Sequence, residues 1–179
     1  MDNYHPAFCG NLVDYLFHDI KGKVGMIVKR FMELVEEARP WVKEVLPWDL
    51  VPELDAGEPL LLLDIREPYE FDVVHIPNSL NVPRGILEQA CETGYEETVA
   101  RLAAAREENV VIICRSGHRS VLAGYVMQLM GFRQVRSLKL GLRGWNDFEL
   151  PLLDGRQQRV DTDDADRYFN PRQPVRPAG

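Results

Sequence analysis

Short apolar runs and helix-spaced apolar residues alternate along this chain. Two runs, residues 60–65 and 110–113, are typical of strands that are buried on both faces. Pro59 and Pro68 stand too close to the first run for a helix, although its four consecutive leucines favour one. Three further segments have strand character, at residues 42–46, 79–82 and 134–138. Five strands alternating with helices predict an α/β domain with a five-stranded parallel sheet and helices on both faces.

Helices are predicted between these strands, at residues 48–54, 67–73, 98–106 and 120–131. Before the first strand, residues 19–39 form a longer amphipathic pattern. Its apolar face comprises Ile20, Val24, Ile27, Val28, Phe31, Leu34, Val35 and Ala38. This helix can pack against the domain, form a surface for a homodimer or another partner, or lie on a membrane. Glutamates in its second half offset the lysines of its first half, which argues against the membrane.

The pattern divides the chain into three parts. Residues 1–42 are expected to be an N-terminal helical extension, and residues 43–153 the α/β domain. Residues 154–179 contain five Asp, five Arg and three Pro with few apolar groups. This composition predicts an extended or disordered C-terminal tail.

Cys114 carries the clearest chemical signal in the sequence. It follows the run at 110–113 and precedes the helix at 120–131, so it falls in a strand-to-helix turn. Main-chain N–H groups in such a turn point inward, and the helix N-terminus adds roughly half a positive charge. Both favour a thiolate, as do the neighbouring Arg115, Arg119 and His118. The alternative is an unreactive core cysteine that ends a strand.

The other residues of the turn are candidates for binding an anion. Arg115 and Arg119 carry guanidinium forks that match an oxyanion, although both can instead be solvated charges. Gly117 allows close approach of the main chain or a positive φ. His118 either tunes the local field or faces water. These residue types beside Cys114 indicate a site for a small anion.

Two further pairs of residues are expected to support the turn. Asp64 lies near the end of the run at 60–65 and Arg66 directly follows it. The carboxyl ends of parallel strands meet at one edge of the sheet, where ligands bind. We expect Asp64 and Arg66 to form an ion-pair or hydrogen-bond network beneath the turn. Ser120, or alternatively Ser116, is expected to cap the helix that follows.

Four segments in this order resemble motifs of the single-domain rhodanese family. Residues 114–120, Cys-Arg-Ser-Gly-His-Arg-Ser, resemble the active loop of rhodanese sulfurtransferases. Residues 64–71 resemble the first rhodanese signature through Asp-Ile-Arg-Glu and Tyr-Glu-Phe. Residues 75–79 resemble the family's His-Ile-Pro-Gly-Ala, with Asn-Ser in place of Gly-Ala, and residues 141–145 resemble its Gly-Gly-x-x-x-Trp element. The resemblance covers about residues 43–150 and implies the rhodanese-like fold.

The resemblance also implies a thiosulfate sulfurtransferase. In that chemistry the Cys114 thiolate takes sulfur from thiosulfate or a persulfide donor and holds it as a persulfide, and a thiol or cyanide removes it. Cys114 is then the catalytic residue, and the substrate-binding residues are Arg115, Ser116, Gly117, His118 and Arg119. Asp64, Arg66 and Ser120 have supporting roles. Neither a cofactor nor a metal ion is expected.

Two other functions remain open at this point. Phosphatases and arsenate reductases of the same fold have five residues between the nucleophilic cysteine and the arginine, whereas four separate Cys114 from Arg119. The shorter loop favours sulfur over the larger phosphate. Non-catalytic rhodanese-like interaction modules commonly lack the cysteine, which this chain keeps.

Composition limits the partners and the compartment. The net charge of −7 argues against nucleic acid, and residues 43–153 hold 17 acidic and 11 basic side chains, so the positive charge at Cys114 is local. The expected partners are a small anionic sulfur donor and a sulfur-carrier protein. Three cysteines without disulfide spacing suggest a reducing compartment, and no apolar stretch is long enough to span a membrane. A cytoplasmic protein is expected.

Overall fold

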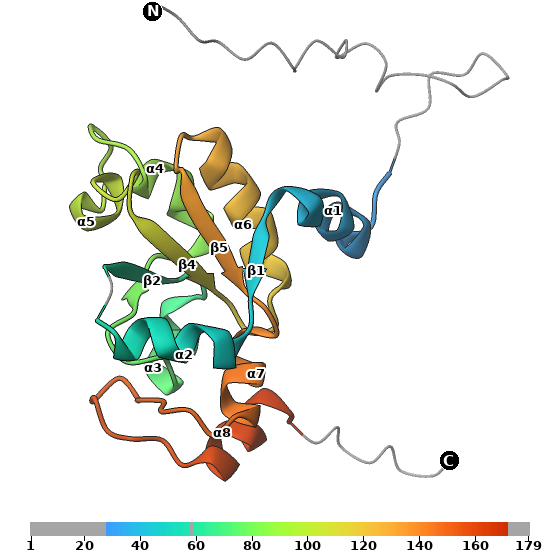
Figure 1. Ribbon diagram of the computed structural model, residues 1–179, viewed down its shortest axis with the longest axis vertical. Helices are drawn as coiled ribbons and strands as arrows, with labels where there is room; N and C mark the ends of the chain where they lie inside the picture. The colour runs from blue at the N-terminus through green and yellow to red at the C-terminus, as the bar shows by residue number, and fades with distance from the viewer. Residues whose placement is uncertain (1–27, 58, 172–179) are drawn as a thin grey trace, which may run out of the picture. The chain divides into compact units, whose positions relative to one another are not determined.

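The centre of the molecule is a parallel sheet. The computed structural model describes residues 28–57 and 59–171 (Figure 1). Five strands lie in the order β1-β5-β4-β2-β3, and every pair is parallel. The strands are β1 Lys43–Val45, β2 Leu60–Asp64, β3 Leu80–Asn81, β4 Asn109–Ile113 and β5 Gln134–Leu138. The predicted α/β class and the five-stranded parallel sheet are confirmed.

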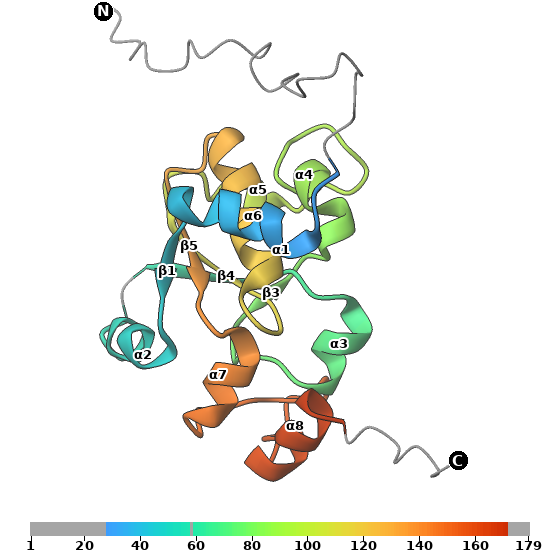
Figure 2. The ribbon, with the colours of Figure 1, turned by 90° about the vertical axis from the view of Figure 1, so that its right-hand side faces the viewer.

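Helices cover both faces of this sheet. The helical elements are α1 Phe31–Ala38, η1 Arg39–Trp41, α2 Pro47–Asp55, α3 Pro68–Val73, η2 Arg84–Ile86, α4 Leu87–Ala90, α5 Ala100–Ala103, α6 His118–Leu129, α7 Gly141–Asp147 and α8 Thr162–Phe169. Figures 1 and 2 show α2 and α6 on opposite faces. Side chains of α4, α5 and α6 share one apolar cluster, and those of α2, α7 and α8 share another.

Successive residues of the central strands enter these two clusters alternately. Leu61 and Leu63 of β2 pack with the α6 cluster, whereas Leu62 packs with the α2 and α7 cluster. β4 follows the same rule, with Val110 on the first face and Val111 on the second. Because side chains alternate along a strand, a strand covered on both faces needs an unbroken apolar run.

The N-terminal helix is shorter than predicted and belongs with the domain. Of the pattern at residues 19–39, residues 19–27 lie outside the described residues, residues 28–30 are not helical, and α1 begins at Phe31. Val35 and Ala38 of α1 are buried against Val121 of α6. The boundary expected between residues 42 and 43 therefore does not separate α1 from the domain.

The expectation of an extended or disordered tail is wrong for residues 162–169, which form α8. The Asp161 side chain accepts a hydrogen bond from the Asp163 N–H at 2.9 Å and caps the helix. Ala165 and Phe169, four residues apart on one side of α8, are each only 1% exposed. Two apolar residues at helical spacing are enough to bury one side of a polar helix, which composition does not reveal. Residues 172–179 lie outside the described part.

Candidate active site

The candidate nucleophile lies at the carboxyl edge of the sheet. Cys114 follows the last residue of β4, Ile113, which is in register with Asp64 at the end of β2. The Ile65 N–H also donates to the Ile113 carbonyl at 3.0 Å. Asp64 and Cys114 therefore lie at the same edge, as expected for neighbouring parallel strands.

The loop backbone turns toward the sulfur of Cys114. The Gly117 N–H donates to Cys114 Sγ at 3.2 Å. Gly117 has φ of +88°, and a Cβ there would lie 3.2 Å from the Leu140 nitrogen and 3.3 Å from the Leu138 oxygen. Glycine is required by both its backbone angle and this close approach. The sulfur thus has a main-chain donor beside it, although the side chain is only 1% exposed.

A buried pair of serine hydroxyls lies beside the same sulfur. Ser120 Oγ is 3.4 Å from Cys114 Sγ and 2.7 Å from Ser137 Oγ. Because α6 begins at His118, Ser120 lies inside the helix, and its hydroxyl donates to the Gly117 carbonyl at 2.9 Å. Ser120 and Ser116 therefore do not cap α6 as predicted. Ser120 links the loop to β5 through Ser137.

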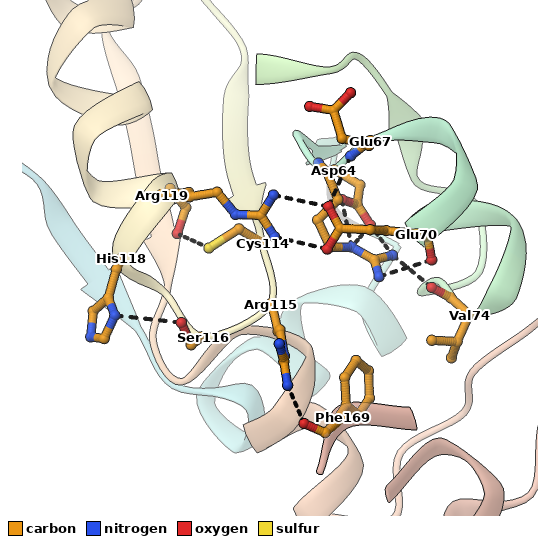
Figure 3. Close-up of polar contacts among 12 residues, drawn as sticks. Asp64, Glu67, Glu70, Val74, Cys114, Arg115, Ser116, His118, Arg119 and Phe169 are labelled. Carbon is orange, nitrogen blue, oxygen red and sulfur yellow. Dashed lines mark hydrogen bonds and ion pairs between the residues drawn. The ribbon is translucent and has the colours of Figure 1, made fainter. Parts of the chain in front are cut away.

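Arg119 is held by a carboxylate. Its two terminal nitrogens donate to the two oxygens of Glu70, both at 2.9 Å (Figure 3). Glu70 also accepts the Glu67 N–H at 3.2 Å and so closes the first turn of α3. The charge of Arg119 is thus compensated within the protein. A bidentate pair of this kind fixes the orientation of the guanidinium.

The charge state of this pair follows from its surroundings. Burial raises the pKa of Glu70, but the hydrogen bonds from Arg119 and from the Glu67 N–H outweigh it, and the net pKa lies below the ordinary value of 4.5. The hydrogen bond to Glu70 raises the pKa of Arg119. Both groups are therefore charged at neutral pH, and Glu70 stays ionised to a lower pH than an ordinary glutamate does.

A second ion pair lies fully buried beneath the loop. The Arg66 and Asp64 side chains are both 0% exposed, and Arg66 Nη2 is 2.7 Å from Asp64 Oδ2. The remaining donors of Arg66 reach the carbonyls of Glu70 at 3.1 Å and Val74 at 2.6 Å. The expected Asp64–Arg66 network is present. It ties the end of β2 to α3, which carries the partner of Arg119.

Arg115 and His118 point away from the sulfur. Arg115 donates to the main-chain carbonyl of Phe169, at the end of α8 (Figure 3). His118 Nδ1 is 3.5 Å from Ser116 Oγ, and the His118 ring meets the edge of the Phe31 ring with centroids 6.3 Å apart. All three basic side chains predicted around Cys114 therefore contact elements outside the loop: Arg119 contacts α3, Arg115 contacts α8 and His118 contacts α1.

The N-terminus of α7 supports the loop from below. The N–H groups of Leu142 and Arg143 donate to the carbonyls of Cys114 and Arg115 at 3.0 and 3.1 Å. Gly141 has φ of +59°, and a Cβ there would lie 2.3 Å from the Cys114 oxygen. This contact explains the glycine that begins the segment at residues 141–145.

Three contributors to the site were not identified from the sequence. Glu70 lies within the Tyr-Glu-Phe segment of the motif at 64–71, and this motif is the sequence feature from which its role could have been predicted. Ser137 has no local signal, because its role depends on the register of β5 beside β4. Phe169 takes part through its carbonyl, which every residue has.

Within residues 28–57 and 59–171, no group of three or more His, Cys, Asp or Glu side chains could hold a metal ion. In the same residues, no helix has the length and hydrophobicity needed to cross a bilayer.

Comparison with known proteins identifies the domain. The model of the rhodanese-like domain matches residues 48–148, which include β2, β4, the Cys114 loop and α7. The chain belongs to the rhodanese-like family. The family match ends before residue 154, so α8 of this rhodanese-like protein lies outside it.

Relatives of this rhodanese-like protein are named for sulfur chemistry. A proposed mitochondrial thiosulfate sulfurtransferase of Schizosaccharomyces pombe is 33% identical over 90 residues, which are 49% of this chain and 63% of that protein. A proposed sulfur carrier protein of Bacillus subtilis, YrkF, is 33% identical over 92 residues, or 51% of this chain and 44% of that protein. The chain thus spans less than two thirds of either relative.

A solved structure shares the fold over most of its length. A protein of unknown function from Rhodopseudomonas palustris, suggested to be a tyrosine phosphatase, matches with a TM-score of 0.63 and 26% identity. The match covers 73% of this chain and 98% of that one.

Proposed function

We propose that this protein is a sulfurtransferase that moves sulfane sulfur from thiosulfate or a persulfide donor to a thiol or cyanide through a persulfide on Cys114. The observation that carries the proposal is the position of Cys114 at the end of β4, with the Gly117 N–H directed at its sulfur at 3.2 Å. Family membership and the names of the relatives support the same chemistry.

The proposed reaction has two displacements at sulfur. The Cys114 thiolate attacks the outer sulfur of thiosulfate, a new S–S bond forms, and the old S–S bond breaks with its electron pair leaving on sulfite. The thiolate of the acceptor then attacks the outer sulfur of the persulfide, and the Cys114 thiolate leaves. No external oxidant or reductant is needed, because the transferred atom carries six valence electrons each time.

The loop residues have distinct proposed roles. Main-chain N–H groups of residues 115–119, including those of Ser116, Gly117 and His118, stabilise the charge on the persulfide and on the departing sulfite. Arg115 binds the donor oxyanion. The charge of Arg119 is shared with Glu70, so Arg119 contributes mainly by fixing the start of α6. Asp64, Arg66 and Ser120 support this arrangement.

Mass spectrometry of the intact full chain tests the proposal. After incubation with thiosulfate, and separately with a low-molecular-weight persulfide, we expect one added sulfur atom that maps to Cys114 and disappears on addition of cyanide. The Cys114→Ser variant should gain none, and Cys91→Ser is the matched control that should behave like the native chain. Cys114-dependent hydrolysis of an aryl phosphate with no persulfide would instead establish the phosphatase alternative.

We also propose an acceptor, a dimer surface and a compartment for this protein. A sulfur-carrier protein is the proposed physiological acceptor, by analogy with the sulfur-carrier name of a relative. We further propose that the protein forms a homodimer through the outer side of α1. Free Cys91 and Cys114 are what a reducing compartment preserves, which supports the cytoplasm. If Cys114 takes up no sulfur and hydrolyses no phosphate, the remaining function is that of a rhodanese-like interaction module.

A further inference from the structure

Three arginines lie near Cys114, and they differ in what balances their charge. Arg66 is paired with the carboxylate of Asp64, and Arg119 with that of Glu70. Arg115 meets a neutral group, the carbonyl of Phe169, and among the described residues no carboxylate lies within ion-pair distance of it. A carbonyl orients a guanidinium without cancelling its charge. Arg115 is therefore the arginine of the three whose positive charge stays available to an anion.

The partner of Arg115 is the carboxyl end of a helix. Phe169 is the last residue of α8, and the last carbonyls of a helix lack partners within it and carry partial negative charge. Arg115 supplies a donor to this end. The interaction is reciprocal, because Arg115 caps α8 while α8 sets the direction in which the Arg115 side chain extends.

The packing of α8 fixes the direction in which the Arg115 side chain extends. The Phe169 side chain is buried in the cluster that contains Leu142 and Trp145 of α7. Asn146 of α7 donates to the Thr162 carbonyl at the start of α8 at 3.1 Å. Since α7 also holds the carbonyls of the Cys114 loop, α8 is joined to the loop both through α7 and through the Arg115 side chain.

Tyr168, next to Phe169 in α8, lies close enough to charged residues of the site to be affected by them. The pKa of its phenol is raised by burial, and the charges of Arg66, Glu70 and Arg115 act on it. The Tyr168 side chain also packs against the apolar cluster that contains Val74, at the end of α3. The C-terminal segment thus lies beside the arginines of the site, although the family match ends at residue 148.

We propose that α8 is a component of the active site, in which the Phe169 carbonyl positions Arg115 so that its charge selects anionic sulfur donors. That the selected anion is a sulfur donor rests on the proposed function. The effect of the Arg115 charge on an approaching anion does not depend on it. Phe169 is a positioning residue that acts through Arg115. The Arg115 side chain extends away from the Cys114 sulfur toward α8, but its charge is held in one position beside the loop. This charge attracts a thiosulfate dianion that approaches the loop, and no freely moving side chain has to be ordered, which lowers the entropic cost of binding.

Two alkylating reagents of similar size test this field directly. Iodoacetate is anionic and iodoacetamide is neutral, and both transfer a carbon to the Cys114 sulfur with loss of iodide. The ratio of their rate constants at Cys114, measured on the full chain by peptide mapping, reports the charge that an approaching anion meets. We expect Arg115→Met to lower the iodoacetate to iodoacetamide ratio by roughly tenfold. Phe169→Ala keeps the main-chain carbonyl but removes the buried ring that fixes the end of α8, and we expect it to lower the ratio by roughly three- to fivefold.

Leu152→Ala is the matched control, because Leu152 is buried in the same cluster and gives no carbonyl to Arg115. It should leave the ratio unchanged. In the double variant Arg115→Met with Phe169→Ala, the second change should have no further effect, since Phe169 acts through Arg115. Thiosulfate kinetics should follow the ratio, with a higher KM and an unchanged kcat in Phe169→Ala.

Either of two results overturns the inference. In the first, Phe169→Ala gives the same iodoacetate to iodoacetamide ratio as Leu152→Ala. In the second, Phe169→Ala lowers the ratio by the same factor in the Arg115→Met background as in the native chain. If Phe169→Ala does not fold, hydrogen exchange in α8 decides instead: Arg115→Met should speed exchange across Thr162–Phe169, and Arg119→Met should not. Equal exchange in both variants also overturns it. If the proposed sulfur transfer is wrong, no persulfide will form on Cys114. The alkylation ratio does not require a persulfide, so the two failures can be distinguished.

Discussion

Cys91 and Cys114 are both buried, at 0% and 1% exposed, and both belong to the apolar cluster beneath α6. Their polar surroundings are opposite. Burial raises the pKa of the Cys91 thiol to about 11, and the nearby Glu88 carboxylate adds to this effect. Cys114 instead receives the Gly117 N–H and lies beside the start of α6. Exposure alone therefore does not distinguish the two cysteines, whereas the groups that face each sulfur do, and they are the basis for proposing Cys114 as the reactive one.

Removal of each sulfur in turn is the strongest test of this contrast. Cys114→Ser should reduce thiosulfate to cyanide sulfur transfer on the order of a thousandfold or more, because the covalent nucleophile is lost. Cys91→Ser should change the rate by less than about twofold, provided that it folds. The steady-state transfer rate of each folded variant decides. Substantial transfer by Cys114→Ser would contradict the assignment.

Gly141→Ala disturbs the surroundings of Cys114 and leaves those of Cys91 in place. The added Cβ would lie 2.3 Å from the Cys114 oxygen, a main-chain atom that cannot move without moving the loop. We expect the free energy of unfolding to fall by about 2 to 4 kcal/mol, and sulfur transfer to fall by roughly tenfold or more.

Gly85→Ala is the control for this change, since a Cβ at Gly85 meets nothing within 4 Å. Its free energy of unfolding should stay within about 0.5 kcal/mol of the native value. Denaturant unfolding and the transfer assay on both variants measure the difference, and equal behaviour would show that the loop tolerates displacement from below.

Alkylation compares the two cysteines within one molecule. A thiol with a pKa of about 11 is almost entirely protonated near neutral pH, so iodoacetamide should modify Cys91 at least on the order of a hundredfold more slowly than Cys114. The labelling of Cys91 should rise toward pH 11. Peptide mapping after timed labelling resolves each site, and equal rates at neutral pH would remove the contrast.

The raised pKa of Cys91 should also appear in stability at alkaline pH. Unfolded Cys91 ionises near its ordinary value of 9.0, whereas folded Cys91 stays protonated until about pH 11. The stabilisation from its protonated form is therefore fully present below pH 9 and is lost as pH rises through 11. The difference in unfolding free energy between the native chain and Cys91→Ala should shrink by up to about 2 to 3 kcal/mol across this range. A constant difference in denaturant titrations would contradict the raised pKa.

The sheet and the position of Cys114 at its carboxyl edge were predictable because their signals are local. The apolar runs at β2 and β4 record burial on both faces, and Cys114 follows directly after one of them. The partners of the loop were not predictable in this way. Glu70, Ser137 and Phe169 reach it through tertiary packing, and α8 depends on two apolar residues within a charged segment.

The helix start shows how a small local error changes a predicted role. The apolar pattern places the beginning of the helix at residue 120, but α6 begins at His118 because Gly117 adopts a positive φ. This shift moves Ser120 from the cap into the helix, where its hydroxyl faces the sulfur instead of the first N–H groups.

The strand order also determines when parts of the chain can fold. Within residues 28–57 and 59–171, β1 is the first strand in the sequence and β5 the last, and β1 lies at the edge of the sheet and pairs with β5 alone. During synthesis from the N-terminus, residues 43–45 have no pairing partner until residues 134–138 have left the ribosome. The α1 helix likewise cannot pack until α6 has been synthesised. Contacts between segments so far apart in the sequence require the closure of long loops, which slows folding. Val35, Val42 and Val45, all buried in the finished protein, stay exposed to water and to chaperones during that interval.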